Sequence, residues 1–196
     1  PYFIAMCESI DYEMGRLFES IAADELDNTI IIFLGDNGTA MEVIQPPYAS
    51  TKAKGSLYQG GVHVPMIISG TGVNRINERD NNLISSTDLF STIAEIAGID
   101  LPTYNDSYSF LPLLSEASEG QRDYNYTEVL GNFPNKSGYT IRDIQYKLII
   151  LDSGNKKFYD LLNDPYENYD LLTGSLTSEQ QNAMSQLENK AMEIRN

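Results

Sequence analysis

The stretch Thr29-Ile30-Ile31-Ile32-Phe33-Leu34-Gly35-Asp36-Asn37-Gly38 decides the fold class of this chain. Residues 29–34 form a continuous β-branched and apolar run, which lacks the alternation of a strand with one solvated face. Such a run predicts a strand buried on both faces, as in a parallel sheet covered by helices. The turn over residues 35–38 then lies at the carboxyl end of that strand, the edge where open α/β sheets bind ligands.

The segments on either side of this strand complete an α/β pattern. A preceding helix is predicted from an apolar stripe at helical spacing, formed by Cys7, Ile10, Met14, Leu17 and Ile21. Cys7 is therefore expected to be a core residue rather than a nucleophile. A long polar segment over residues 35–61 leads to a second buried strand over residues 64–69, and Ser86 or Thr87 is expected to cap a helix that ends at Gly98. This order predicts a mostly parallel sheet flanked by helices.

The second half of the chain has a different character. Short strand-like runs separated by polar turns predict a small antiparallel sheet over residues 124–130, 139–142, 146–151 and 157–159. Thr177 and Gln180 can form a capping box at the start of a terminal helix. We therefore expect an α/β core portion over residues 1–115 and a C-terminal α+β subdomain over residues 116–196.

Composition excludes several classes of protein. With 13 basic and 28 acidic residues, the net charge of −15 argues against a nucleic-acid partner, because neutralising phosphates needs clustered Lys and Arg. No apolar run approaches the roughly 18 residues of a membrane span. A single cysteine excludes an intrachain disulfide.

Asp36 and Asn37 are the residues in this chain with the chemistry of a metal site. A carboxylate beside a carboxamide supplies the hard oxygen ligands that suit Ca²⁺ or Mg²⁺. The same Asp-Asn-Gly sequence is also a common turn, so the residues by themselves leave both interpretations open. Lys54 is equally open, either as a solvated loop lysine or as a cation for a bound anion.

The order of motifs around these residues favours a metal site at Asp36-Asn37 and an anion-binding role for Lys54. The turn is followed by Lys54-Gly55-Ser56-Leu57-Tyr58-Gln59-Gly60-Gly61-Val62-His63-Val64-Pro65 and then by the second strand. This order resembles the type I sulfatases of the alkaline phosphatase superfamily, whose usual wording is Asp-Asn/His-Gly and then Lys-Gly-x-x-Tyr-Glu-Gly-Gly-x-Arg-Val-Pro. Further matches follow in the same order over residues 87–98, 109–114, 142–149 and 158–168.

The resemblance implies that this chain contains part of an alkaline phosphatase-like core. It also implies a metal and sulfate site and a hydrolytic function. Asp36 and Asn37 would be two ligands of a Ca²⁺, with Mg²⁺ the less favoured ion, and Lys54 would contact a sulfate oxygen and stabilise charge as the ester bond breaks. The protein would be a periplasmic or extracellular sulfuric ester hydrolase acting on sulfate esters, sulfated carbohydrates among them. A phosphoester or phosphonate hydrolase of the same superfamily is the alternative, and an inactive remnant or binding module is the third.

Departures from the family pattern matter as much as the matches. Gln59 stands where the family commonly has Glu, and His63, which we predict to be structural, stands where it commonly has Arg. The family's nucleophile is a formylglycine made from Cys or Ser in Cys/Ser-x-Pro-x-Arg, and these 196 residues contain no such motif. We therefore expect the nucleophile upstream of Pro1, and expect this chain alone to be inactive and to bind calcium poorly.

Overall fold

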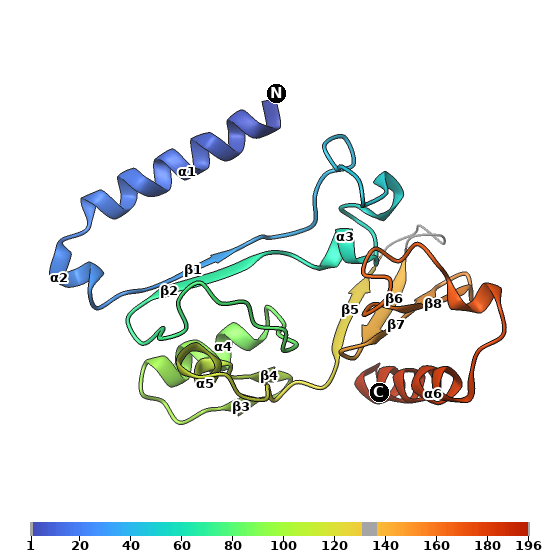
Figure 1. Cartoon of the computed structure of the whole chain (residues 1–196). Coiled ribbons are helices and arrows are strands. Elements are labelled where there is room, and N and C mark those ends of the chain that lie inside the picture. The colour runs from blue at the N-terminus through green and yellow to red at the C-terminus, as the bar shows by residue number, and fades with distance from the viewer. Residues whose placement is uncertain (1, 131–136, 196) are drawn as a thin grey trace.

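The computed structural model describes residues 2–130 and 137–195 (Figure 1). Its helices are α1 (Tyr2–Ser20), α2 (Ala23–Leu26), α3 (Gln59–Val62), α4 (Asp88–Ile96), α5 (Leu111–Ser115) and α6 (Ser178–Arg195), with short 3₁₀ helices η1 (Ser50–Lys52) and η2 (Leu171–Thr173). Its strands are β1 (Ile30–Leu34), β2 (Met66–Gly70), β3 (Thr103–Tyr104), β4 (Ser107–Tyr108), β5 (Asn125–Val129), β6 (Gly138–Arg142), β7 (Tyr146–Leu151) and β8 (Lys156–Asp160). Within these ranges, no helix combines the length and apolarity that crossing a membrane requires.

The mixed α/β class is confirmed, but the predicted parallel direction of the first two strands is wrong. β1 and β2 pair antiparallel, with Ile30 opposite Gly70 and Leu34 opposite Met66. The chain leaves β1, forms a long loop and returns beside it, without the crossover helix that a parallel pair requires. The prediction that β1 is buried on both faces is also wrong, since Phe33 on β1 is 37% exposed.

The predicted first helix forms as α1, but its apolar stripe is not buried. α1 buries none of its residues, and Ile10 and Leu17 are more than half exposed. Cys7 is exposed as well, which corrects its assignment to the core. The physical reason is that no other described segment packs over this face of α1, which lies apart from the C-terminal sheet in Figure 1.

The start of α4 is held differently from the prediction. Neither Ser86 nor Thr87 caps the helix through its side chain. Instead the buried Asp88 carboxylate accepts a hydrogen bond of 2.7 Å from the Ser85 backbone N–H and one of 2.9 Å from Arg122 Nε. The Asp88 carboxylate therefore ties the first residue of α4 to the backbone before the helix and to Arg122 through charge-assisted hydrogen bonds.

The predicted C-terminal sheet and helix are confirmed. The strands lie in the order β5-β6-β7-β8, all antiparallel, and α6 packs against β6 and β7 (Figure 1). The capping box forms as expected, since the Gln180 backbone N–H donates to Thr177 Oγ1 at 3.2 Å and the Thr177 N–H donates to Gln180 Oε1 at 2.9 Å. Leu187 and Ala191 of α6 are fully buried in the resulting core.

The other face of this sheet holds the long loop between β1 and β2. Leu57 of that loop is buried against Ile149 of β7, Tyr159 of β8 and Leu161. β7 therefore has both faces covered, with Leu148 toward α6 and Ile149 toward the loop. The candidate site segment is thus supported by the C-terminal sheet.

Candidate functional site

The two sequence segments that carry the predicted site residues are joined by backbone hydrogen bonds. The Gly38 N–H, at the end of the turn over residues 35–38, donates to the Gly61 carbonyl at 3.1 Å. The Lys54 N–H donates to the Thr39 carbonyl at 2.9 Å. The structure therefore brings the Asp-Asn turn and the lysine segment into direct contact, as the candidate site requires.

Glycine is needed where these segments meet. A Cβ on Gly38 would lie 2.1 Å from the Gly60 carbonyl oxygen, and a Cβ on Gly61 would lie 2.2 Å from the Ser56 carbonyl oxygen. No side chain fits at either contact, because both obstacles are backbone atoms. The glycine after Asp36-Asn37 and the second glycine of Gly60-Gly61 are thus explained by close backbone approach.

The site residues themselves are not used by the fold. Asp36 and Lys54 are exposed and Asn37 is half-buried. Among the residues that the structure describes, none of these three side chains makes a hydrogen bond or an ion pair. A carboxylate, a carboxamide and an ammonium group on adjoining segments are therefore free for a ligand.

The donor set fits a hard divalent cation only in part. Asp36 and Asn37 supply oxygen ligands, which suit calcium, but calcium takes six to eight. Nowhere in residues 2–130 and 137–195 do three or more His, Cys, Asp or Glu side chains come together in a way that could hold a metal ion. Further ligands would have to come from another part of the protein, from substrate or from water.

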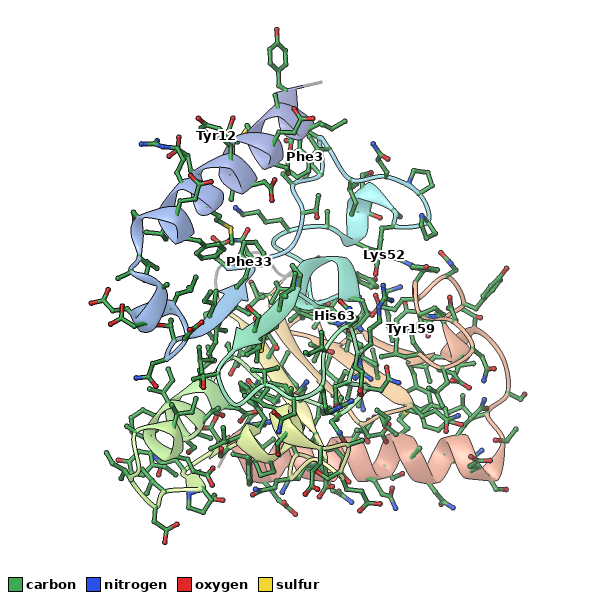
Figure 2. All side chains as sticks on the ribbon, turned by 60° about the vertical axis from the view of Figure 1, so that its left-hand side comes forward. Phe3, Tyr12, Phe33, Lys52, His63 and Tyr159 are labelled. Carbon is green, nitrogen blue, oxygen red and sulfur yellow. The ribbon has the colours of Figure 1, made fainter. Side chains whose placement is uncertain are left out.

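The neighbouring lysine, Lys52, is not the solvated residue that its loop position indicates. Its ammonium donates to the backbone carbonyl of Glu167 and lies 5.2 Å from the ring centroid of Tyr58. It also lies 5.8 Å from the ring centroid of Tyr159, and Figure 2 labels both Lys52 and Tyr159. Desolvation lowers the pKa of Lys52, although the negative charge of Glu167 opposes the shift. Lys52 therefore anchors the loop, whereas Lys54 remains available.

A buried ionic network behind the loop was not foreseen from the sequence. Lys147 Nζ lies 2.7 Å from Glu167 Oε1 and donates to Gln59 Oε1 at 3.2 Å, and the Gln59 backbone N–H donates to Glu167 Oε2 at 2.7 Å. The Lys147 and Glu167 side chains are 0% and 1% exposed. Burial lowers the pKa of Lys147 to about 8, against the opposing effect of Glu167. The sequence signal for this network is a lysine inside the apolar run of β7.

His63 follows α3 and its backbone N–H closes that helix on the Gln59 carbonyl at 2.9 Å. His63 is exposed, and its imidazole makes no hydrogen bond to any residue in the described ranges. Desolvation by the surrounding atoms lowers the pKa of His63, and the positive charges of Arg142 and Lys147 lower it further. These effects favour the neutral form of the imidazole, and its structural role stays a prediction.

Family models and individual relatives both assign this chain to the sulfatase family. The sulfatase family model matches residues 2–99, and a model described as N-sulphoglucosamine sulphohydrolase, C-terminal, matches residues 52–196. Arylsulfatase K of Canis lupus familiaris is 31% identical over 184 residues, which cover 88% of this chain and 33% of that protein. A sulfatase of Formosa agariphila is 30% identical over 190 residues, covering 86% of this chain and 33% of that protein. The chain thus spans about a third of the length of these relatives.

Solved structures share the fold. A protein solved in complex with its substrate D-glucosamine-2-N,6-O-disulfate superimposes with a TM-score of 0.78 at 23% identity, over 96% of this chain and 39% of that one. The phosphonate monoester hydrolase of Agrobacterium radiobacter superimposes with a TM-score of 0.69 at 21% identity, over 95% of this chain and 39% of that one.

Proposed function

Since this chain belongs to the sulfatase family, we propose that it forms part of a sulfuric ester hydrolase and carries one side of its metal and sulfate site. The observation that carries the proposal is the pairing of two segments whose polar side chains the fold leaves unused. Asp36, Asn37 and Lys54 lie on those segments, and backbone hydrogen bonds join them. The formylglycine nucleophile is proposed to lie upstream of Pro1, because these 196 residues contain no Cys/Ser-x-Pro-x-Arg sequence.

Lys54 has the central role in the proposed mechanism. As the ester S–O bond breaks, negative charge develops on the sulfuryl oxygens and the leaving group. An ammonium aimed at those oxygens stabilises the transition state more than the ground state. In a chain of net charge −15, such local positive charge is also needed to hold an anionic substrate.

Asp36 and Asn37 are proposed to hold the cation of the site through the carboxylate and the amide oxygen. Calcium is the proposed ion, and when bound it supplies positive charge next to the sulfate oxygens. Because the two side chains have no other partners among the described residues, they can take up a ligand without breaking contacts of the fold.

Sulfated carbohydrates are the proposed substrate class. The support is a structural relative solved with a disulfated glucosamine as its substrate. A periplasmic or extracellular location is proposed on the family resemblance.

Phosphonate or phosphate ester hydrolysis is the second candidate, favoured by the structural likeness to a phosphonate monoester hydrolase. The complete protein that contains these residues should be assayed against matched sulfate, phosphate and phosphonate esters of one leaving group. We expect the sulfate ester to have the highest kcat/KM, and Asp36→Ala to reduce it. A higher kcat/KM for a phosphate or phosphonate ester would favour the second candidate, and no turnover of any ester would favour an inactive binding module.

A further inference from the structure

We propose that Glu167, held by Lys147, is a positioning residue for the sulfate site and fixes the Lys54 segment by accepting a hydrogen bond from the Gln59 backbone N–H. This inference rests on the proposed function for its effect on turnover. The clamp itself is a structural claim that can be tested without any turnover.

The clamp joins parts of the chain that are far apart in sequence. Glu167 and Gln59 are separated by 108 positions, and their hydrogen bond of 2.7 Å is buried. Gln59 is the first residue of α3, whose N-cap residue Tyr58 makes no capping hydrogen bond through its side chain. The Glu167 carboxylate therefore satisfies a helix N–H that would otherwise be buried without a partner.

The single turn of α3 connects Gln59 to the Asp-Asn turn over residues 35–38. The Gly61 N–H donates to the Tyr58 carbonyl at 2.8 Å, so the single turn of α3 fixes Gly61 relative to Gln59. The Gly61 carbonyl in turn accepts the Gly38 N–H at 3.1 Å. Gly38 directly follows Asn37, which places the clamp behind the proposed metal ligands as well as behind Lys54.

The charge of the buried Lys147–Glu167 pair and the backbone conformation of Glu167 both indicate that the pair does more than stabilise the fold. A buried ion pair is weak support for stability, since an apolar pair of similar size often does as well. Glu167 also has a φ of 58°, a left-handed conformation that is uncommon for a residue with a side chain. Strained conformations of this kind are concentrated at functional sites.

Lys147 and Lys52 hold Glu167 from two sides. Lys147 pairs with the carboxylate, while the Lys52 ammonium takes the Glu167 backbone carbonyl. Gln59 contributes a neutral oxygen to Lys147. The buried Lys147–Glu167 pair therefore carries one positive and one negative charge, to which Gln59 adds none.

Two substitutions at Gln59 separate the backbone donor from the side chain. Gln59→Pro removes the N–H at a first helical position, where proline is tolerated, and the extended conformation of Tyr58 (φ −79°, ψ 164°) suits a residue before proline. Gln59→Ala keeps the N–H and removes the same side-chain contact with Lys147. Any difference between the two variants therefore reports on the donor to Glu167.

The test compares these variants in the complete protein by kcat, KM and peptide-resolved hydrogen exchange over residues 35–44. Gln59→Pro is expected to have a kcat at least tenfold below that of Gln59→Ala, because small misplacements of catalytic groups reduce turnover by up to about 10²-fold. It is also expected to exchange faster in that peptide, which contains the Gly38 amide. As a second pair, Lys147→Met/Glu167→Gln retains an acceptor for the N–H and Lys147→Met/Glu167→Leu does not, so the second is expected to be the slower.

Equal kcat and equal exchange in Gln59→Pro and Gln59→Ala would overturn the clamp. If the unmodified protein turns over no sulfate ester, the proposed function fails, and the exchange comparison still decides the clamp alone.

Discussion

The Glu167 carboxylate accepts a hydrogen bond of 2.7 Å from the Gln59 backbone N–H while its other oxygen lies 2.7 Å from Lys147 Nζ. One carboxylate thus neutralises a buried lysine and caps the helix next to the candidate site. This relationship ties the C-terminal sheet to the loop that carries Lys54. Substitutions in the sheet at Lys147 should therefore alter the conformation of that loop.

Removing the lysine alone should be strongly destabilising. Lys147→Met leaves Glu167 as a buried charge without its ion-pair partner, for which a loss of about 3–5 kcal/mol in the free energy of unfolding is typical. The double variant Lys147→Met/Glu167→Gln removes both charges and should recover most of that loss. Urea unfolding of the three proteins measures this, and a double variant no more stable than Lys147→Met would contradict it.

Close backbone packing at the site predicts that Gly61 tolerates no side chain. The Cβ of Gly61→Ala would lie 2.2 Å from the Ser56 carbonyl oxygen, so the segments must move apart. We expect a loss of about 1–3 kcal/mol in unfolding free energy, as for other overpacked sites. Gly15→Ala is the matched control, because its Cβ would meet nothing within 4 Å and alanine in a helix gains about 0.5–1 kcal/mol. Equal stabilities of the two variants would count against the packing argument.

The lowered pKa of His63 predicts a pH dependence of stability. The unfolded chain binds a proton at His63 below its ordinary pKa of about 6.5, whereas the folded chain does so only at lower pH. Stability contributed by this group is therefore present above about pH 6.5 and falls as the pH falls toward the folded value. His63→Gln should lose less stability than the unmodified chain between pH 7 and pH 5, measured as the shift in urea midpoint. An equal or larger loss in the variant would show that His63 is not responsible.

Calcium should bind the 196-residue chain only weakly. Asp36 and Asn37 provide two of the six to eight oxygens that the ion takes, so we expect a Kd of about 10⁻³ M or weaker. Isothermal titration of the chain with Ca²⁺, alongside Asp36→Ala, measures this. Micromolar binding that Asp36→Ala abolishes would mean that this chain contains a complete site.

Local features of the fold were predictable from sequence because neighbours in the chain determine them. The capping box at Thr177 and the four strands of the C-terminal sheet follow from spacing and turn chemistry. The direction of β1 and β2 was not predictable, since an apolar run indicates burial and does not specify the partner. The start of α4 was missed because Arg122, which holds Asp88, comes 34 residues later.

In the candidate site, too, local features were predictable from sequence and contacts between distant residues were not. The turn at Asp36-Asn37 and the proposed role of Lys54 are predictions from motif order, and the structure adds the backbone contacts that join the two segments. The Gln59–Glu167 clamp could not be predicted, because no local pattern links positions 108 residues apart. Sequence also could not distinguish Lys52 from Lys54, since their difference depends on the rings of Tyr58 and Tyr159.

The most direct test of the central claim is the kcat for sulfate release by the complete protein carrying Lys54→Ala. Lys190→Ala, which changes a lysine on the surface of α6, is the matched control. The proposed role in charge stabilisation predicts a fall of about 10²–10³-fold for Lys54→Ala and an unchanged rate for the control. A kcat within twofold of the unmodified protein in Lys54→Ala would contradict the assignment of this site.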